Sequence, residues 1–243
     1  MKYELNNSGI IETAEFDDQA VEQVFLPLVK QLTRLQKEKN RRVVAFLAAP
    51  PGAGKSTLAA FLAHLSRITE DVTEITTIGM DGFHRYQEYL LTHTTVRDGR
   101  EIPMVKIKGA PVTFDLEKLT AAVERVAAGE ECGWPVYDRL LHNPVEDAVQ
   151  VTGDIVLLEG NYLLLDTEGW RELKKYADLT ISLSADADFL RNRLVSRKKK
   201  TGTPAQEAED FVDSSDMVNV QTCLNESSQA DIRIQVLGDG KFI

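Results

Sequence analysis

The chain has 243 residues, of which 43% are hydrophobic and 27% are charged, a balance typical of a folded globular protein rather than a disordered one. Its formal net charge is −10, which argues against nucleic acid or an anionic membrane surface as a partner, because either would require a broad basic face. The two cysteines, Cys132 and Cys223, form no CxxC or Cys/His pattern, so the sequence disfavours a disulfide scaffold and a zinc site.

The amino-terminal residues 1–15 contain no basic region followed by an apolar run, and no apolar segment approaches the length needed to cross a bilayer. We therefore expect a cytoplasmic protein. The absence of repeats and of low-complexity linkers predicts a single domain over 1–243, with 1–40 as an amino-terminal extension and helix. The sequence does not fix the oligomeric state and is compatible with a homodimer.

In chain order, residues 1–17 are polar and irregular, with room for a short strand. Asp17 or Asp18 is suited to cap a helix that runs to about Lys39, where apolar residues recur at helical spacing. The apolar run 43–47 predicts a strand that leads into a glycine-rich loop. Helices are then expected at 57–66, 115–128, 168–176, 186–200 and 204–226, and further strands at 74–79, 154–159, 178–183 and 231–236.

Strands that alternate with helices predict an α/β fold, in which a mostly parallel sheet is covered by helices on both faces. The run 155–158 is apolar at successive positions, as expected for a strand buried on both sides. The stretch 92–114 shows no clear periodicity and contains two glycines and two prolines. In an enzyme, such a long loop would serve as a substrate loop or a lid.

The glycine-rich loop reads Ala49-Pro50-Pro51-Gly52-Ala53-Gly54-Lys55-Ser56, which is the phosphate-binding pattern G-x-x-x-x-G-K-[ST] with Ala49 in place of the first glycine. The backbone N–H groups from about Ala53 to Thr57 would surround the β-phosphate, and the helix dipole would add to the attraction. Lys55 would bridge the β- and γ-phosphates, Ser56 would ligate Mg²⁺, and Thr57 would contact the α-phosphate. The expected nucleotide-binding residues are Gly52, Ala53, Gly54, Lys55, Ser56 and Thr57.

Two carboxylates follow predicted strands. Glu159 ends a buried strand and would face the ligand crevice of an open α/β sheet, where it could hold the Mg²⁺ water shell. Asp81 follows the strand at 74–79 and could orient and deprotonate an acceptor hydroxyl. The Asp81-Gly82 pair is equally typical of an ordinary turn, and the pattern alone does not separate the two interpretations.

Five separated segments carry a resemblance to a known family. They are the loop at 49–57, Met80-Asp81-Gly82-Phe83-His84, the segment 108–115 that begins Lys108-Gly109-Ala110-Pro111, the segment 135–142 that contains Tyr137-Asp138-Arg139 and His142, and Leu158-Glu159-Gly160-Asn161. In order and spacing they resemble the family that joins uridine kinase, phosphoribulokinase and bacterial-type pantothenate kinase. The similarity is strongest to its nucleoside/nucleotide kinase-like branch.

The resemblance implies a P-loop NTPase fold of the nucleoside-kinase type, with a five-stranded parallel core and a small lid at 190–226. It implies Asp81 as catalytic base and Glu159 near the metal. The acceptor-site candidates that it implies are His84, Lys108, Tyr137, Arg139, His142, Asn161 and Tyr162. Pro144 stands where uridine kinases have an arginine, so the resemblance transfers the chemistry and not the acceptor.

The predicted helix 186–200 is basic and ends near Gly202. Arg193 and Arg197 are four residues apart and share one face, whereas Arg191 points elsewhere. Closed over ATP, this arginine pair would act catalytically by stabilising charge on the transferring group. A solvated basic face that complements the helix dipole is the alternative interpretation, and we apply it to the lysines at 198–200.

Together these features predict an ATP- and Mg²⁺-dependent phosphotransferase whose partner is a small-molecule acceptor, a nucleoside, sugar or pantothenate-like compound that offers a hydroxyl. One alternative is a nucleotide kinase with a phosphate acceptor, since an arginine cluster could bind that phosphate; the candidates are Arg85, Arg97, Arg100 and Arg139. A second alternative is a regulatory P-loop NTPase, although the Asp-Gly-Phe-His segment would have no role in a switch.

Overall fold

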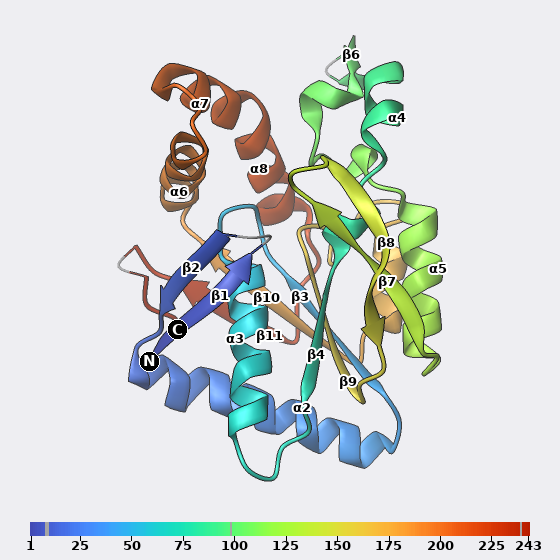
Figure 1. Cartoon of the computed structure of the whole chain (residues 1–243), viewed down its shortest axis with the longest axis vertical. Helices are drawn as coiled ribbons and strands as arrows, with labels where there is room; N and C mark the ends of the chain where they lie inside the picture. The colour runs from blue at the N-terminus through green and yellow to red at the C-terminus, as the bar shows by residue number, and fades with distance from the viewer. Residues whose placement is uncertain (8–9, 98, 239) are drawn as a thin grey trace.

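The computed structural model describes residues 1–7, 10–97, 99–238 and 240–243, and at its centre lies a five-stranded sheet (Figure 1). The strand order is β11-β10-β3-β9-β4, and all four neighbouring pairs are parallel. The strands are β3 (Val43–Ala48), β4 (Ile75–Gly79), β9 (Ile155–Gly160), β10 (Leu179–Ala185) and β11 (Ile232–Val236). The expected parallel five-stranded sheet is thus confirmed.

Side chains of the central strand β3 alternate between two hydrophobic cores, one on each face of the sheet. Val43, Ala45 and Leu47 pack toward the helices α2 (Leu26–Lys39) and α3 (Lys55–Ile68), whereas Val44 and Phe46 pack toward α5 (Leu116–Ala127). Because both faces are covered, β3 and β9 read as continuous apolar runs rather than as alternating ones.

The amino-terminal region forms a hairpin and one long helix. The hairpin pairs β1 (Lys2–Asn7) with β2 (Ile10–Glu15), where the sequence had left room for one strand. The helix begins with α1 (Asp18–Ala20), passes through a wider π turn and continues as α2. The Asp17 side chain accepts a hydrogen bond from the Ala20 N–H at 2.8 Å, which confirms the predicted cap. The helix ends at Asn40, whose φ is 50°.

Two further hairpins lie outside the central sheet. The stretch 92–114 was expected as a loop. It follows the short helix α4 (Gln87–Thr92) and contains a hairpin of β5 (Thr94–Arg97) and β6 (Arg100–Pro103). Two 3-10 turns come after the hairpin, at Met104–Ile107 and Pro111–Thr113. The hairpin of β7 (Cys132–Asp138) and β8 (Asn143–Val151) was not predicted. Buried Trp134 connects the β7–β8 hairpin to the central sheet, because the Trp134 indole N–H donates a hydrogen bond to the Gly79 carbonyl at 2.8 Å.

Three helices follow near the carboxyl terminus, and they lie across the strand ends from the outer hairpins (Figure 1). They are α6 (Ala187–Lys200), α7 (Ala205–Phe211) and α8 (Met217–Glu226). The helix expected at 204–226 is continuous through a π turn at Val212–Asp216, and the one expected at 168–176 is a 3-10 helix over Arg171–Tyr176. In Figure 1 the helices α6, α7 and α8 lie on one side of the sheet's carboxyl edge and the outer hairpins lie on the opposite side.

Candidate functional site

The glycine-rich loop joins β3 to α3 at the carboxyl edge of the sheet, and Lys55 begins the helix. Gly52 and Gly54 have φ of 84° and 94°, a region that residues with a Cβ rarely adopt. A Cβ at Gly52 would also lie 3.1 Å from Cγ of Leu194 on α6. The predicted strand, loop and helix are therefore present, and their turn requires glycine at both positions.

Ser56 and Glu159 meet at the end of this loop. The Ser56 hydroxyl donates a hydrogen bond to Glu159 Oε1 at 2.8 Å. Burial raises the pKa of the Glu159 carboxyl, and the charge of Lys55 and the Ser56 hydrogen bond only partly oppose that rise. A partly buried carboxyl beside a hydroxyl is a set of oxygen donors that suits Mg²⁺.

The described residues contain no group of three or more His, Cys, Asp or Glu side chains around one metal position. An ion at Ser56 and Glu159 would therefore complete its coordination with nucleotide phosphates and water, which is the usual arrangement for Mg²⁺. The two residues fit a metal that arrives with its nucleotide.

Asp81 follows β4 in a 3-10 turn at Met80–Phe83, on the same edge of the sheet. Burial tends to raise the pKa of its carboxyl, but the charges of His84, Lys55, Arg139 and Arg197 outweigh burial and lower it. Asp81 is therefore held as a carboxylate within electrostatic reach of the phosphate-loop lysine, on a strand adjacent to the one that carries Glu159.

Close packing against β7 fixes the turn that carries Asp81. A Cβ at Gly82 would lie 2.0 Å from the Pro135 carbonyl oxygen, so only glycine allows this approach. The ring of Phe83 packs edge-on against Trp134 with centroids 4.8 Å apart. The glycine of the Asp-Gly pair is thus explained by a backbone contact with β7, because Gly82 does not have a left-handed φ.

A polar cluster extends from Asp81 toward the outer hairpin. The His84 Nδ1 lies 2.9 Å from the Asp81 backbone oxygen, and the His84 ring lies 5.1 Å from that of Tyr137. Beyond Tyr137, the Lys108 ammonium lies 5.0 Å from the ring centroid and donates to the His142 carbonyl at 3.1 Å. Residues from three of the five separated segments thereby lie together.

The remaining predicted acceptor residues are placed differently. The Tyr162 ring is fully buried, and its hydroxyl donates to the Gly109 carbonyl at 2.6 Å, so Tyr162 lies behind the site and supports the segment that carries Lys108. Burial raises the pKa of Tyr162. Asn161 keeps a buried Oδ1 without a hydrogen-bond partner, and Arg139 is exposed near the turn of the β7–β8 hairpin.

On α6, Arg193 and Arg191 point in different directions, as the helical spacing predicts. A Cβ at Gly54 would lie 3.6 Å from Arg193 Nη2, which places this guanidinium over the phosphate loop. The charge of Arg197 acts on Asp81. Arg191 instead forms two hydrogen bonds with Asp213, at 2.6 and 2.7 Å.

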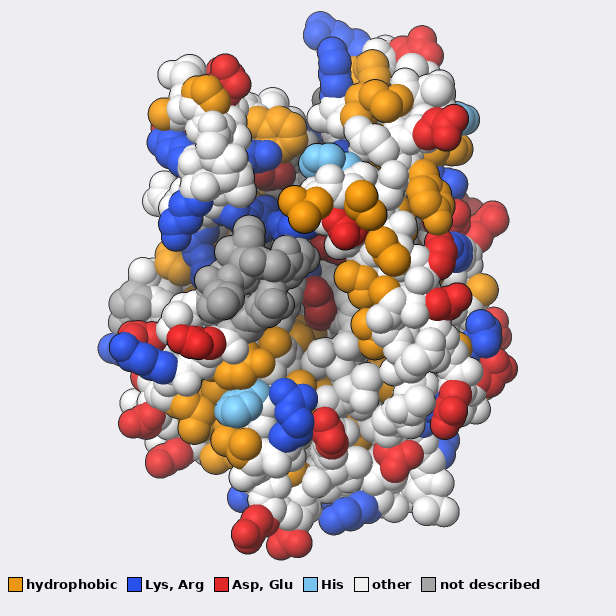
Figure 2. Space-filling view, in the orientation of Figure 1, with side chains coloured by type: hydrophobic (Ala, Val, Ile, Leu, Met, Phe, Trp, Pro, Cys, Tyr) orange, Lys and Arg blue, Asp and Glu red, His pale blue; other side chains and the backbone are white. Residues whose placement is uncertain are grey.

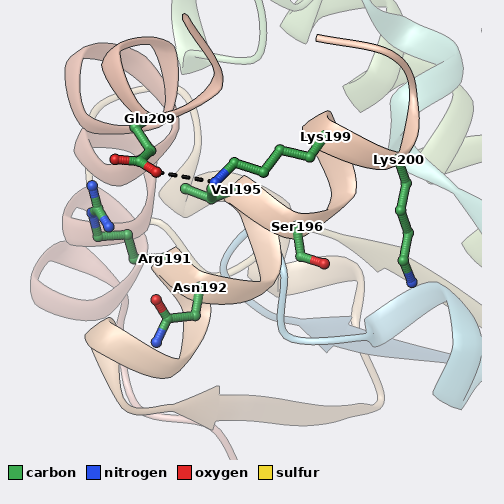
Figure 3. Close-up of a pocket in the computed structure, with 7 residues that line it drawn as sticks. All are labelled: Arg191, Asn192, Val195, Ser196, Lys199, Lys200 and Glu209. Atoms are coloured by element: carbon green, nitrogen blue, oxygen red, sulfur yellow. Dashed lines mark hydrogen bonds and ion pairs between the residues drawn. The ribbon is translucent and has the colours of Figure 1, made fainter. Parts of the chain in front are cut away.

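The lysines of this helix join α6 to α7. Lys198 lies 3.6 Å from the Phe211 ring centroid, and Lys199 pairs with Glu209 at 3.0 Å. Both contacts replace the solvated face that the sequence suggested for these two lysines. A cavity of about 570 Å³ lies between α6 and α7 (Figure 3), and its lining includes neither Arg193 nor Arg197. Figure 2 shows a hollow between the part of the surface over α6 and α7 and the part over the outer hairpins, with Lys and Arg side chains on the side of α6.

The sequence interpretation missed several residues of this region. Gln87 accepts a hydrogen bond from Lys108 at 2.7 Å, and Asn219 on α8 is a buried polar side chain whose Nδ2 would lie 3.6 Å from a Cβ at Gly109. Asp216 has a buried oxygen without a partner. In the sequence, the position of Asn219 between the apolar residues Val218 and Val220 was the signal that could have revealed it.

Comparison with known proteins places this geometry in a family. Residues 44–242 match the pattern described as the Phosphoribulokinase / Uridine kinase family. The chain belongs to the phosphoribulokinase/uridine kinase family. It is 42% identical over 243 residues to the Escherichia coli protein named "Uncharacterized protein YggC", a match that covers the whole chain and 98% of that protein.

Two further proteins are similar to this chain. A Schizosaccharomyces pombe protein named "Putative uridine kinase" is 32% identical over 206 residues, which cover 82% of this chain and 85% of that protein. A solved structure described as a "putative fructose transport system kinase" from Silicibacter sp. has a TM-score of 0.72 and 27% identity, covering 83% of this chain and 98% of that one. The chain thus has a P-loop kinase fold and belongs to a family of small-molecule kinases. None of its described helices is long and apolar enough to span a membrane.

Proposed function

We propose that the chain is an ATP-dependent kinase that transfers the γ-phosphoryl group to a hydroxyl of a small metabolite. The observation that carries this proposal is the position of Asp81 directly after β4, whose last residue Gly79 pairs with Glu159 of β9 at the same edge of the parallel sheet as the phosphate loop. A site for nucleotide binding alone would not need this second carboxylate after a neighbouring strand.

The phosphate loop holds the donor in this proposal. The N–H groups at the start of α3 bind the phosphates, and Lys55 neutralises charge that builds on the oxygen between the β- and γ-phosphorus atoms. Ser56 and Glu159 would hold Mg²⁺, directly and through water. Bound together, ATP and Mg²⁺ supply the phosphoryl group and neutralise its oxygens.

Asp81 acts on the acceptor. It orients the hydroxyl and accepts its proton as the acceptor oxygen forms a bond to the γ-phosphorus and the bond from that phosphorus to ADP breaks. Because the transition state of phosphoryl transfer is loose, alignment contributes more than the basicity of Asp81. Arg193 and Arg197 stabilise the charge on the transferring group from the lid side.

A phosphate acceptor is less well supported than a hydroxyl. Of the arginines that could bind such a phosphate, Arg85 lies 3.6 Å from the Asp115 carboxylate and is already engaged. Arg97 and Arg100 belong to the outer hairpin β5–β6. The hydroxyl proposal instead uses groups that surround Asp81 itself.

The test is an acceptor-dependent ADP-release screen over nucleosides, sugars, pantothenate and nucleotides. At least one hydroxyl compound is expected to stimulate ADP release, and Lys55→Ala is expected to abolish it while the protein remains folded by circular dichroism. Stimulation by nucleotides alone would favour the phosphate acceptor. Wild-type turnover of Lys55→Ala would remove the loop from the mechanism.

A further inference from the structure

Lys108 is a cation held at the acceptor side of the site without an acidic partner. Its ammonium donates to Gln87 Oε1 at 2.7 Å and to the His142 carbonyl at 3.1 Å, both of which are neutral oxygens. No carboxylate among the described residues lies within ion-pair distance of it, and burial alone lowers the pKa of this amine. An ammonium has three N–H donors, so one is available to a further acceptor.

Some lysines of the fold pair with acids at the surface, among them Lys2 with Glu15, Lys118 with Glu146 and Lys199 with Glu209. Lys108 differs from these three in that it is partly buried and in that both oxygens it binds are neutral. A partly buried cation in this state is costly unless an anion completes its surroundings.

A second cation acts on the same part of the site as Lys108. Burial is the main cause that lowers the pKa of the His84 imidazole, and the charges of Lys108 and Arg139 add to it against the nearby Asp81. In a protein of net charge −10, cations on this side of the site favour an anionic ligand group there.

Two distances show how near Lys108 lies to the part of the site that contains Asp81. The Tyr137 ring is close to both: its centroid lies 5.1 Å from the ring of His84, which accompanies Asp81, and 5.0 Å from the Lys108 ammonium. A small metabolite can span two such steps. One molecule could therefore present its hydroxyl to Asp81 and a second group to Lys108.

We propose that the acceptor carries an anionic group, a carboxylate or a phosphate, which binds Lys108 with support from the charge of Arg139 while the hydroxyl of the same molecule meets Asp81. This inference rests on the proposed function and narrows it, because it excludes neutral nucleosides and neutral sugars as preferred acceptors. Tyr162 and Gln87 position Lys108 for this task, through the Gly109 carbonyl and through the Lys108 ammonium itself.

The test uses acceptors in matched pairs that differ in one charge: pantothenate and pantothenol, glycerate and glycerol, ribose 5-phosphate and ribose. ADP release is measured with the wild-type chain, with Lys108→Gln and with Lys106→Gln, an exposed lysine of the same segment, as the control. The anionic member of a productive pair is expected to have a kcat/KM about 10- to 100-fold higher, the worth of one charge-assisted hydrogen bond. Carboxylate and phosphate pairs distinguish the two sources of the charge.

Lys108→Gln should lose most of this preference through KM and leave the KM for ATP unchanged, whereas Lys106→Gln should keep it. Equal turnover of a neutral acceptor and its anionic partner would overturn the inference and leave the proposed function standing. Binding is measured in parallel as the thermal shift that each compound produces with a non-hydrolysable ATP analogue. Failure of every anion to stabilise the wild-type chain more than Lys108→Gln overturns the inference, and selective binding without any turnover overturns the proposed function.

Discussion

Gly82→Ala tests how the contact between β7 and the turn at Met80–Phe83 positions Asp81. The added Cβ would lie 2.0 Å from the Pro135 carbonyl oxygen and 2.4 Å from its carbon, distances at which something must shift. Both atoms are backbone, so no side-chain rotation relieves the clash. Separation to 3.0 Å requires the turn and the strand to move apart by about 1 Å.

Overpacking of this kind costs about 1–3 kcal/mol of folding free energy. A displacement of about 1 Å at a group that aligns the acceptor costs about 10²-fold in rate. We therefore expect Gly82→Ala to unfold at lower urea concentration and to lose acceptor-dependent turnover, with nucleotide affinity retained because the phosphate loop lies elsewhere. Gly238→Ala is the matched control, since a Cβ there meets nothing within 4 Å. Wild-type stability and turnover in Gly82→Ala would refute the reasoning.

The remaining predictions concern the lid and the base of the sheet. Arg193→Gln should reduce kcat by about 10- to 10³-fold in steady-state assays, whereas Arg191→Gln, which breaks only the pair with Asp213, should change kcat little; equal losses would contradict the assignment. Asp178→Asn should destabilise the fold by about 2–3 kcal/mol at pH 7 in urea denaturation, because the carboxylate accepts hydrogen bonds from Arg41 at 2.6 and 2.9 Å. Burial tends to raise the pKa of Asp178 but these partners lower it, so the stabilisation is fully present above the unfolded pKa of about 3.9 and is lost as pH falls from there through the lower folded pKa; a stability difference that does not shrink as the pH is lowered below about 3.9 would contradict this.

The centre of the sheet could be predicted from sequence because β3 and β9 are buried on both faces. Residues 43–48 and 155–158 are apolar at successive positions, and the first run is followed by the glycine-rich loop and the second by Glu159. Burial of a strand on both sides leaves a pattern that does not depend on its neighbours in space. The expected ranges of β10 and β11 agree with the structure to within one or two residues, although β11 lies at the edge of the sheet and alternates apolar residues with exposed polar ones.

The β7–β8 hairpin could not be read in this way. Pro135 interrupts the first strand, and the register shifts between Trp134 and Val136, which breaks the alternation expected of a half-buried strand. β8 is mostly exposed, and its apolar residues do not alternate regularly with polar ones. Its position follows from tertiary contacts such as the Trp134 bond to Gly79, which no local pattern encodes.

The candidate site likewise contains residues that local motifs predict and residues whose positions depend on tertiary contacts. The phosphate loop and Glu159 follow from local motifs, since each lies at the end of its own strand. The approach of Lys108 to Tyr137 depends on how two outer segments fold toward each other, and only the structure reveals it. Tyr162 was expected in the site and lies behind it, because its ring fills the core beside Phe114 and Trp170.

The most direct test of the account is a paired measurement of nucleotide affinity and kcat in Asp81→Asn. Asparagine keeps the size of the side chain and removes the proton-accepting carboxylate. We predict that ATP affinity stays nearly unchanged while the acceptor-dependent kcat falls by about 10²- to 10⁴-fold, or about 3–5 kcal/mol of transition-state stabilisation. Unimpaired kcat in Asp81→Asn would contradict the assignment of Asp81 to hydroxyl activation, and with it the proposed transfer to a hydroxyl.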